Sequence, residues 1–179
     1  MTCIVGLVEN GKVYIGGDSA GVAGLDIVTR TDEKVFKKGN MIFGFTSSFR
    51  MGQLLRYSFK IPDHDPRIDD CEYLCSIFID ELMKCFKEKG YAKINNNEVA
   101  GGFFLLGYNG NLYKIESDFQ VGMAIDKFDA CGCGESFALG ALKANQKNKI
   151  TPKERIIKAL EVAEYFSAGV RSPFNIVSI

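Results

Sequence analysis

The residues best suited to chemistry lie at the start of the chain, where Thr2 opens two short apolar runs joined by Asn10-Gly11. Both turn residues accept positive φ angles, so residues 2–8 and 12–18 are predicted to pair as a hairpin. If Met1 is removed, Thr2 carries a free α-amine, a base with an ordinary pKa of about 8, beside its own hydroxyl. The two groups together make an activated nucleophile, because the amine can take the proton of the hydroxyl.

Two charged residues follow Thr2 at regular spacing. Asp18 lies sixteen positions after Thr2, and Lys34 lies sixteen positions after Asp18. The segments Thr2-Cys3-Ile4-Val5 and Gly16-Gly17-Asp18-Ser19, together with Lys34, resemble the start of a proteasome β-type subunit. They also resemble the bacterial proteasome-like peptidases that form rings with an ATPase cap; both groups are N-terminal nucleophile hydrolases. Residues 130–140 resemble the family's Gly-Ser-Gly turn before a helix, so the resemblance covers most of the chain.

This resemblance implies a role for each residue in peptide-bond hydrolysis. Thr2 is the nucleophile. The Lys34 ammonium lies near the Thr2 hydroxyl and lowers the pKa of that hydroxyl, while Asp18 orients Lys34 and balances its buried charge. Taken without the resemblance, Thr2 is an ordinary residue of an edge strand, Lys34 a solvated strand-end charge and Asp18 a turn-capping carboxylate.

Further site residues are carried over with a change of residue type. Cys133 stands where the family has a serine that hydrogen-bonds the terminal amine, and a thiol is a weaker partner. Glu164 and Ser167 resemble an aspartate and a serine that stabilise the amine and the nucleophile; Glu164 is one methylene longer, and its pattern alone indicates a solvent-facing residue. Ser47 supplies a backbone N–H to the oxyanion, provided its backbone adopts the conformation of the family's glycine.

Cysteines and the single histidine were weighed as metal ligands. Cys131 and Cys133 have one residue between them and no second pair, which is not the spacing of a zinc site. The segment Asp63-His64-Asp65 needs a further ligand from elsewhere, so a polar loop is the preferred interpretation. We therefore predict no metal and no cofactor. Six cysteines without a secretory signal are expected to be free thiols in a reducing cytoplasm.

Length and composition predict one soluble domain covering residues 1–179. Hydrophobic residues make up 46% of the chain and charged residues 25%, which suits a globular protein with a full core. A formal net charge of zero argues against a nucleic-acid surface. No apolar run approaches the roughly 20 residues of a membrane span, and the start lacks the pattern of a signal peptide. We expect a cytoplasmic protein with no nucleic-acid or membrane partner.

The hydrophobic pattern predicts strands, two helices, strands, two helices and a last strand, which is an α+β chain order. For this order the resemblance implies a four-layer αββα sandwich. Residues 19–32 are expected to be an irregular loop, and 98–106 a central strand. Buried helix faces are expected to include Cys71, Cys75, Phe137 and Phe166. The remaining predicted strands are 2–8, 12–18, 34–37, 41–46, 112–116, 120–125, 128–131 and 173–179. The predicted helices begin directly after residues 46–52, 69–70, 134 and 151.

These observations lead to three hypotheses of function. The first is a threonine peptidase that cleaves unfolded polypeptides or peptides inside a homo-oligomeric ring or spiral, with an ATPase unfoldase as a candidate partner. The second is a catalytically inactive subunit that keeps the fold and the assembly surface. The third is an amidase of the same superfamily with a small-molecule substrate. Retention of Met1 favours the second, because Thr2 then has no free amine.

Overall fold

Two antiparallel sheets packed face to face form the centre of the molecule. The computed structural model describes residues 1–95 and 98–179. The first sheet consists, in spatial order, of β12 (Phe128–Gly132), β1 (Cys3–Glu9), β2 (Lys12–Gly17) and β13 (Asn175–Ser178). The second consists of β11 (Val121–Gly122), β10 (Asn111–Ile115), β9 (Phe104–Tyr108), β6 (Met41–Phe45) and β5 (Val35–Lys38).

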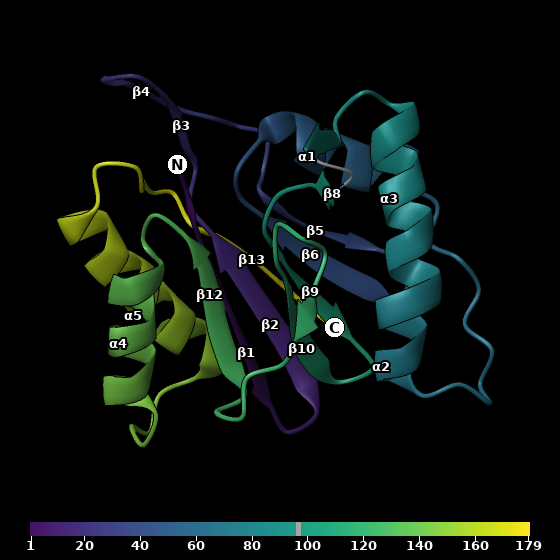
Figure 1. The fold of residues 1–179 in the computed structure, drawn as a ribbon. Coiled ribbons are helices and arrows are strands. Elements are labelled where there is room, and N and C mark those ends of the chain that lie inside the picture. The colour runs from purple at the N-terminus through teal and green to yellow at the C-terminus, as the bar shows by residue number, and fades with distance from the viewer. Residues whose placement is uncertain (96–97) are drawn as a thin grey trace.

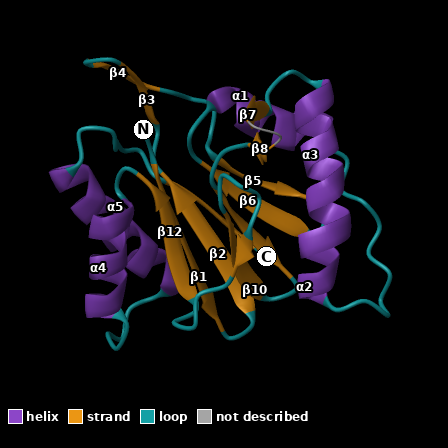
Figure 2. Cartoon of the chain, in the orientation of Figure 1, coloured by secondary structure: helices purple, strands orange, loops and turns teal. Residues whose placement is uncertain are grey.

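Helices cover the outer face of each sheet (Figure 1), which confirms the predicted four-layer αββα sandwich. The first sheet packs against α4 (Glu135–Asn145) and α5 (Pro152–Phe166), as Figure 2 also shows. Over the second sheet lie α1 (Phe49–Gln53), continued by a π-helical turn (Leu54–Ser58), and a longer helix made of α2 (Asp70–Tyr73), a π-helical turn (Leu74–Phe78) and α3 (Ile79–Glu88). None of the helices in the described ranges is long and apolar enough to cross a membrane.

The opening hairpin forms as predicted and places the first residues of the chain. Asn10 and Gly11 have φ angles of 53° and 72°, which a two-residue hairpin turn requires. Strands β1 and β2 pair with Ile4 opposite Gly17. The next residues outward, Cys3 and Asp18, exchange hydrogen bonds, so Asp18 lies one residue from Thr2 at this end of the sheet.

An apolar layer between the two sheets holds them close together. Gly44 on β6 faces this layer, and a Cβ atom at Gly44 would lie 2.5 Å from Ile4 Cγ2 and 2.6 Å from Ile15 Cγ2. Only a residue without a side chain allows the sheets to approach this closely. The buried residues of this layer are Ile4, Val13, Ile15, Val35, Ile42, Leu105, Leu112 and Cys131.

Two predictions of strand position are wrong. Residues 19–32, expected to be an irregular loop, contain the hairpin β3 (Ala20–Ala23) and β4 (Asp26–Thr29). Most of its side chains are at least partly exposed, so it lacks the alternating buried positions by which strands are recognised. The run 98–106 is divided into β8 (Glu98–Ala100), which pairs with β7 (Lys93–Asn95), and the central strand β9. The break falls at Gly101, whose N–H donates to Ser117 O.

Four side chains expected in the core are exposed. Cys71 precedes the π-helical turn and Cys75 lies within it; both face solvent, because this turn has more residues per turn and rotates the buried face. Phe137 and Phe166 are 40% and 62% exposed and stack on each other, with ring centroids 5.3 Å apart. The buried faces of α4 and α5 carry small residues instead, and these bring both helices close to the sheet: Ala138, Ala141, Ala159 and Ala163.

We predict that Gly44→Ala lowers the free energy of unfolding by about 1–3 kcal/mol, since the added methyl group overpacks the layer between the sheets. Urea unfolding measures the change. Gly140→Ala is the matched control, because nothing lies within 4 Å of a Cβ at this position in α4. Alanine also favours the helix, so the control variant is expected to be as stable as the parent or slightly more stable. Equal stability of the two variants would contradict the assigned packing.

Candidate active site

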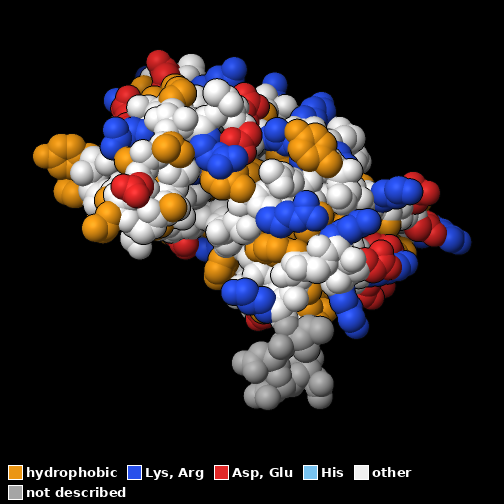
Figure 3. Space-filling view, turned by 90° about the horizontal axis from the view of Figure 1, so that it is seen from above, with side chains coloured by type: hydrophobic (Ala, Val, Ile, Leu, Met, Phe, Trp, Pro, Cys, Tyr) orange, Lys and Arg blue, Asp and Glu red, His pale blue; other side chains and the backbone are white. Residues whose placement is uncertain are grey.

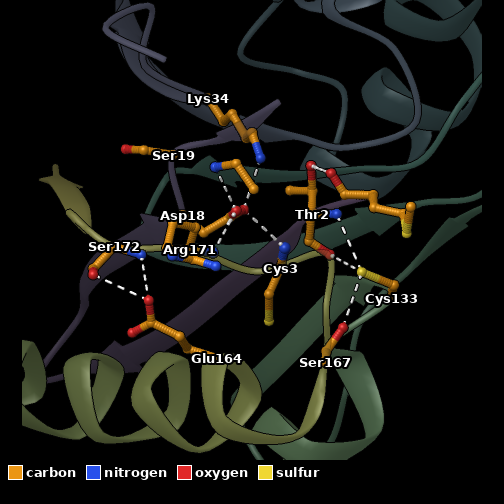
Figure 4. Close-up of polar contacts among 12 residues, drawn as sticks. Thr2, Cys3, Asp18, Ser19, Lys34, Cys133, Glu164, Ser167, Arg171 and Ser172 are labelled. Atoms are coloured by element: carbon orange, nitrogen blue, oxygen red, sulfur yellow. Dashed lines mark hydrogen bonds and ion pairs between the residues drawn. The ribbon is translucent and has the colours of Figure 1, made fainter. Parts of the chain in front are cut away.

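A buried carboxylate at the end of β2 gathers four hydrogen-bond donors (Figure 4). Asp18 Oδ1 accepts from Lys34 Nζ at 2.8 Å and from the backbone N–H of Cys3 at 3.0 Å. Its Oδ2 accepts from the backbone N–H groups of Ala20 at 2.8 Å and Arg171 at 3.2 Å. Asp18 thus joins segments that are far apart in the sequence at one point beside Thr2.

Lys34 is the only charged partner of Asp18 among these donors, and both residues are only 1% exposed. Burial lowers the pKa of the Lys34 ammonium, and the charge and hydrogen bond of Asp18 oppose that change. An ammonium held without water beside a hydroxyl stabilises the alkoxide form of that hydroxyl. Asp18 therefore holds the Lys34 ammonium in a cavity that Thr2 also lines.

Thr2 lies directly before β1 with its side chain almost wholly buried; the residue is 4% exposed. With Met1 attached, the Thr2 hydroxyl donates to the Met1 carbonyl oxygen. The backbone N–H of Thr2 donates to Cys133 Sγ at 3.3 Å. The nitrogen that becomes the α-amine after removal of Met1 is therefore already directed at Cys133.

The turn before α4 brings Cys133 to this nitrogen. Gly132 has a φ angle of 104°, and a Cβ there would lie 2.2 Å from the Thr2 carbonyl oxygen. Only glycine fits this close approach. Ser167 Oγ donates to Cys133 Sγ at 3.3 Å, so Ser167 reaches Thr2 through Cys133.

Ser47 has the backbone conformation that a glycine would favour. Its φ angle is 68°, in the left-handed region, and its Oγ accepts a hydrogen bond from Phe103 N at 3.2 Å. Its own backbone N–H makes no hydrogen bond to any described residue. A cavity of about 70 Å³ is lined by Ser47, Thr2 and Lys34, with Phe45 and Phe49 among its other walls. Ser47, Thr2 and Lys34 thus line one small cavity.

Glu164 is the one predicted site residue that the structure does not bring to Thr2. Its carboxylate accepts from Ser172 N at 2.8 Å and from Ser172 Oγ at 3.0 Å, as Figure 4 shows. This contact fixes the loop in which the neighbouring Arg171 donates its backbone N–H to Asp18. Sequence reasoning missed Arg171 and Ala20, because a backbone donor leaves no signal in the residue type.

The other candidate ligands have separate places in the fold. Cys131 is buried between the sheets, and burial raises the pKa of its thiol well above the ordinary value, so it does not act with the exposed Cys133. His64 stacks on Tyr73, and its two ring nitrogens contact Tyr108 Oη at 2.6 Å and Ile68 O at 2.8 Å. Within residues 1–95 and 98–179, no group of three or more His, Cys, Asp or Glu side chains is arranged to hold a metal ion.

Comparison with solved structures relates this arrangement to known folds. BPH, a bacterial proteasome homologue from Thiobacillus denitrificans, superposes with a TM-score of 0.85 at 19% identity, covering 99% of this chain and 97% of that chain. The chain has the fold of the proteasome-like N-terminal nucleophile hydrolases. BPH in complex with epoxomicin matches this proteasome-like chain with a TM-score of 0.84 at 18% identity, over 99% of this chain and 98% of that chain.

Eukaryotic HslV from Trypanosoma brucei shares the proteasome-like fold with a TM-score of 0.71 at 16% identity, over 99% of this chain and 98% of that one. No family model and no curated protein matches the sequence. The similarity is therefore in the fold, and the chemistry has to be argued from the site.

We predict that Asp18→Asn destabilises the fold more than Lys34→Met does. Asparagine leaves the buried Lys34 ammonium without its counter-charge, which costs about 3–5 kcal/mol. After Lys34→Met, the carboxylate keeps its three backbone N–H donors, so the loss is smaller. Urea unfolding of both variants at pH 7 tests this order. A larger loss for Lys34→Met would show that the backbone donors do not support the carboxylate on their own.

Proposed function

We propose that the protein is a threonine-type peptidase whose nucleophile is the Thr2 hydroxyl after removal of Met1. The observation that carries this proposal is the small cavity in which Thr2, Lys34 and the backbone of Ser47 meet. Each supplies a group that acyl transfer needs: a nucleophile, a cation that favours its ionised form and a donor for the oxyanion. The proteasome-like fold adds support, because its known members include peptidases.

The reaction follows from these positions. The Thr2 amine takes the proton of the Thr2 hydroxyl, directly or through a water molecule, while the oxygen attacks the peptide carbonyl. The backbone N–H of Ser47 donates to the oxyanion of the tetrahedral intermediate. The protonated amine then returns the proton to the leaving amine, and an ester to Thr2 remains. Water, deprotonated by the same amine, hydrolyses that ester and releases the product.

One observation favours the second hypothesis, an inactive subunit with a role in assembly. Glu164, expected to stabilise the amine, binds Ser172 instead. In this case the Asp18–Lys34 pair stabilises the fold alone. The presence or absence of Met1 decides which hypothesis can apply, since an amide nitrogen has no usable lone pair.

We predict that the chain beginning at Thr2 is active on fluorogenic peptides and that the chain retaining Met1 is not. A cleavable tag that leaves Thr2 first provides the active form. Thr2→Ala abolishes activity, and Thr2→Ser keeps part of it because the hydroxyl and the amine remain. Lys34→Met loses activity by at least about a hundredfold, which corresponds to nearly 3 kcal/mol of barrier.

Three outcomes would count against this assignment. Equal activity of the forms with and without Met1 would mean that Thr2 is not the nucleophile. If the forms with and without Met1 both assemble but neither cleaves peptides, the hypothesis of a catalytically inactive subunit is favoured. A Lys34→Met variant within about threefold of the parent would remove Lys34 from the mechanism.

The substrate is proposed to be an unfolded polypeptide or a peptide that enters a chamber enclosed by copies of this chain in the cytoplasm, with an ATPase unfoldase as a candidate partner. An exposed cluster of aromatic side chains, Phe137, Tyr165 and Phe166, supports association between copies. Figure 3 shows hydrophobic side chains at several places among the charged ones. The most exposed are Leu25, Val28, Tyr57, Met123, Ile125, Tyr165 and Phe166.

We predict that the protein is a homo-oligomer of at least six subunits, as the proteasome-like fold suggests. Its net charge of zero offers no repulsion to oppose assembly. Sedimentation velocity at micromolar concentration measures the mass directly. A stable monomer under these conditions would refute the chamber.

A further inference from the structure

One sulfur atom lies against the reacting end of the chain. Cys133 Sγ accepts from the Thr2 backbone nitrogen at 3.3 Å and donates to the Thr2 carbonyl oxygen at 3.4 Å. Ser167 Oγ donates to the same sulfur at 3.3 Å. Cys133 is nevertheless an exposed residue, so reagents in solution can reach it.

We propose that removal of Met1 turns this contact into an ammonium–thiolate pair, in which the Thr2 amine and the Cys133 thiol share a proton and modification of Cys133 switches the peptidase off. This inference rests on the proposed function for its effect on activity, but the pair itself does not. Cys133 acts through Thr2 and is a positioning residue: it holds the amine and affects how the amine is protonated.

The physical reason is the change of charge at Thr2. An amide N–H is neutral, whereas an α-ammonium at the same place is a cation about 3 Å from the sulfur, and a neighbouring cation favours the thiolate. The donated hydrogen bond from Ser167 favours the thiolate too. Cys133 also precedes α4 by two residues, and the start of a helix carries partial positive charge.

The surrounding charges leave this effect in place. Lys34 adds a second cation, which is paired with Asp18 at 2.8 Å. Asp18 carries a negative charge, and four donors bind its carboxylate. Glu135, in the first turn of α4, is paired with Lys114 at 2.7 Å. The neighbouring Cys3 thiol stays neutral, because burial raises its pKa.

Covalent modification follows from the thiolate. With methyl methanethiosulfonate, Cys133 S⁻ attacks the sulfenyl sulfur, an S–S bond to a methylthio group forms, and methanesulfinate leaves with the electron pair. The added methylthio group lies beside the nucleophile and replaces the thiol that holds the Thr2 amine in position. Dithiothreitol reverses the step by thiol–disulfide exchange, releasing methanethiol and oxidised dithiothreitol.

The first test measures the pair without any use of activity. The other accessible thiols, Cys71, Cys75 and Cys85, are replaced by serine, and the forms with and without Met1 are compared. Iodoacetamide alkylation of Cys133 at pH 7 is followed by intact mass. We expect alkylation about fivefold faster when Thr2 is first, as a nearby cation raises the thiolate fraction. Equal rates, or a faster reaction of the Met1 form, overturn the proposal.

The second test links the pair to activity. In the Thr2-first chain, methyl methanethiosulfonate is expected to lower peptidase activity at least about tenfold, and dithiothreitol to restore it. Cys133→Ser retains measurable activity, since a hydroxyl still accepts from the amine, and this activity is insensitive to the reagent. Inactivation of Cys133→Ser to the same extent overturns the switch. If the unmodified chain is inert, the proposed function fails. The alkylation rates still show whether Cys133 and the Thr2 amine form the proposed pair.

Discussion

The buried ion pair between Asp18 and Lys34 is the constraint on which the site depends. Two charges that are each 1% exposed are tolerated only if nearly all their polar atoms have partners. Asp18 meets this requirement by accepting from Lys34 and from three backbone N–H groups at Cys3, Ala20 and Arg171. The cost of leaving the carboxylate unsatisfied therefore fixes the start of β1, the residues after β2 and the loop before β13 relative to one another.

Close packing transmits this constraint to the rest of the fold. Gly44 lets the sheet that carries Lys34 approach the sheet that carries Asp18. Gly132 lets the turn before α4 lie against the Thr2 carbonyl, which places Cys133 at the terminal nitrogen. Glu164 contributes from a distance, since its hydrogen bonds to Ser172 hold the loop that supplies the N–H of Arg171. Residues remote from Thr2 are thus part of the same network.

The sequence predicts the parts of this arrangement that depend on residue type. Asn10-Gly11 indicated the hairpin, and with it the closeness of Thr2 and Asp18; Thr151 and Pro152 indicated the start of α5, where a capping box forms. Features that are set by the backbone could not be predicted from the sequence. The π-helical turn that contains Cys75 rotates a helix without any special residue, and the donors from Ala20 and Arg171 are independent of their side chains.

Ser47 shows how tertiary contacts can override the backbone preference of a residue type. A left-handed conformation disfavours serine, yet the N–H of Phe103 binds the Ser47 hydroxyl, and the neighbouring Thr46 N–H binds Phe103 O, so the segment is held from both sides. The charges of the site are equally fixed, because Asp18 and Lys34 are enclosed. The partner of the terminal nitrogen is the exposed Cys133. A substitution at the exposed Cys133 therefore disturbs the fold less than one in the buried Asp18–Lys34 pair.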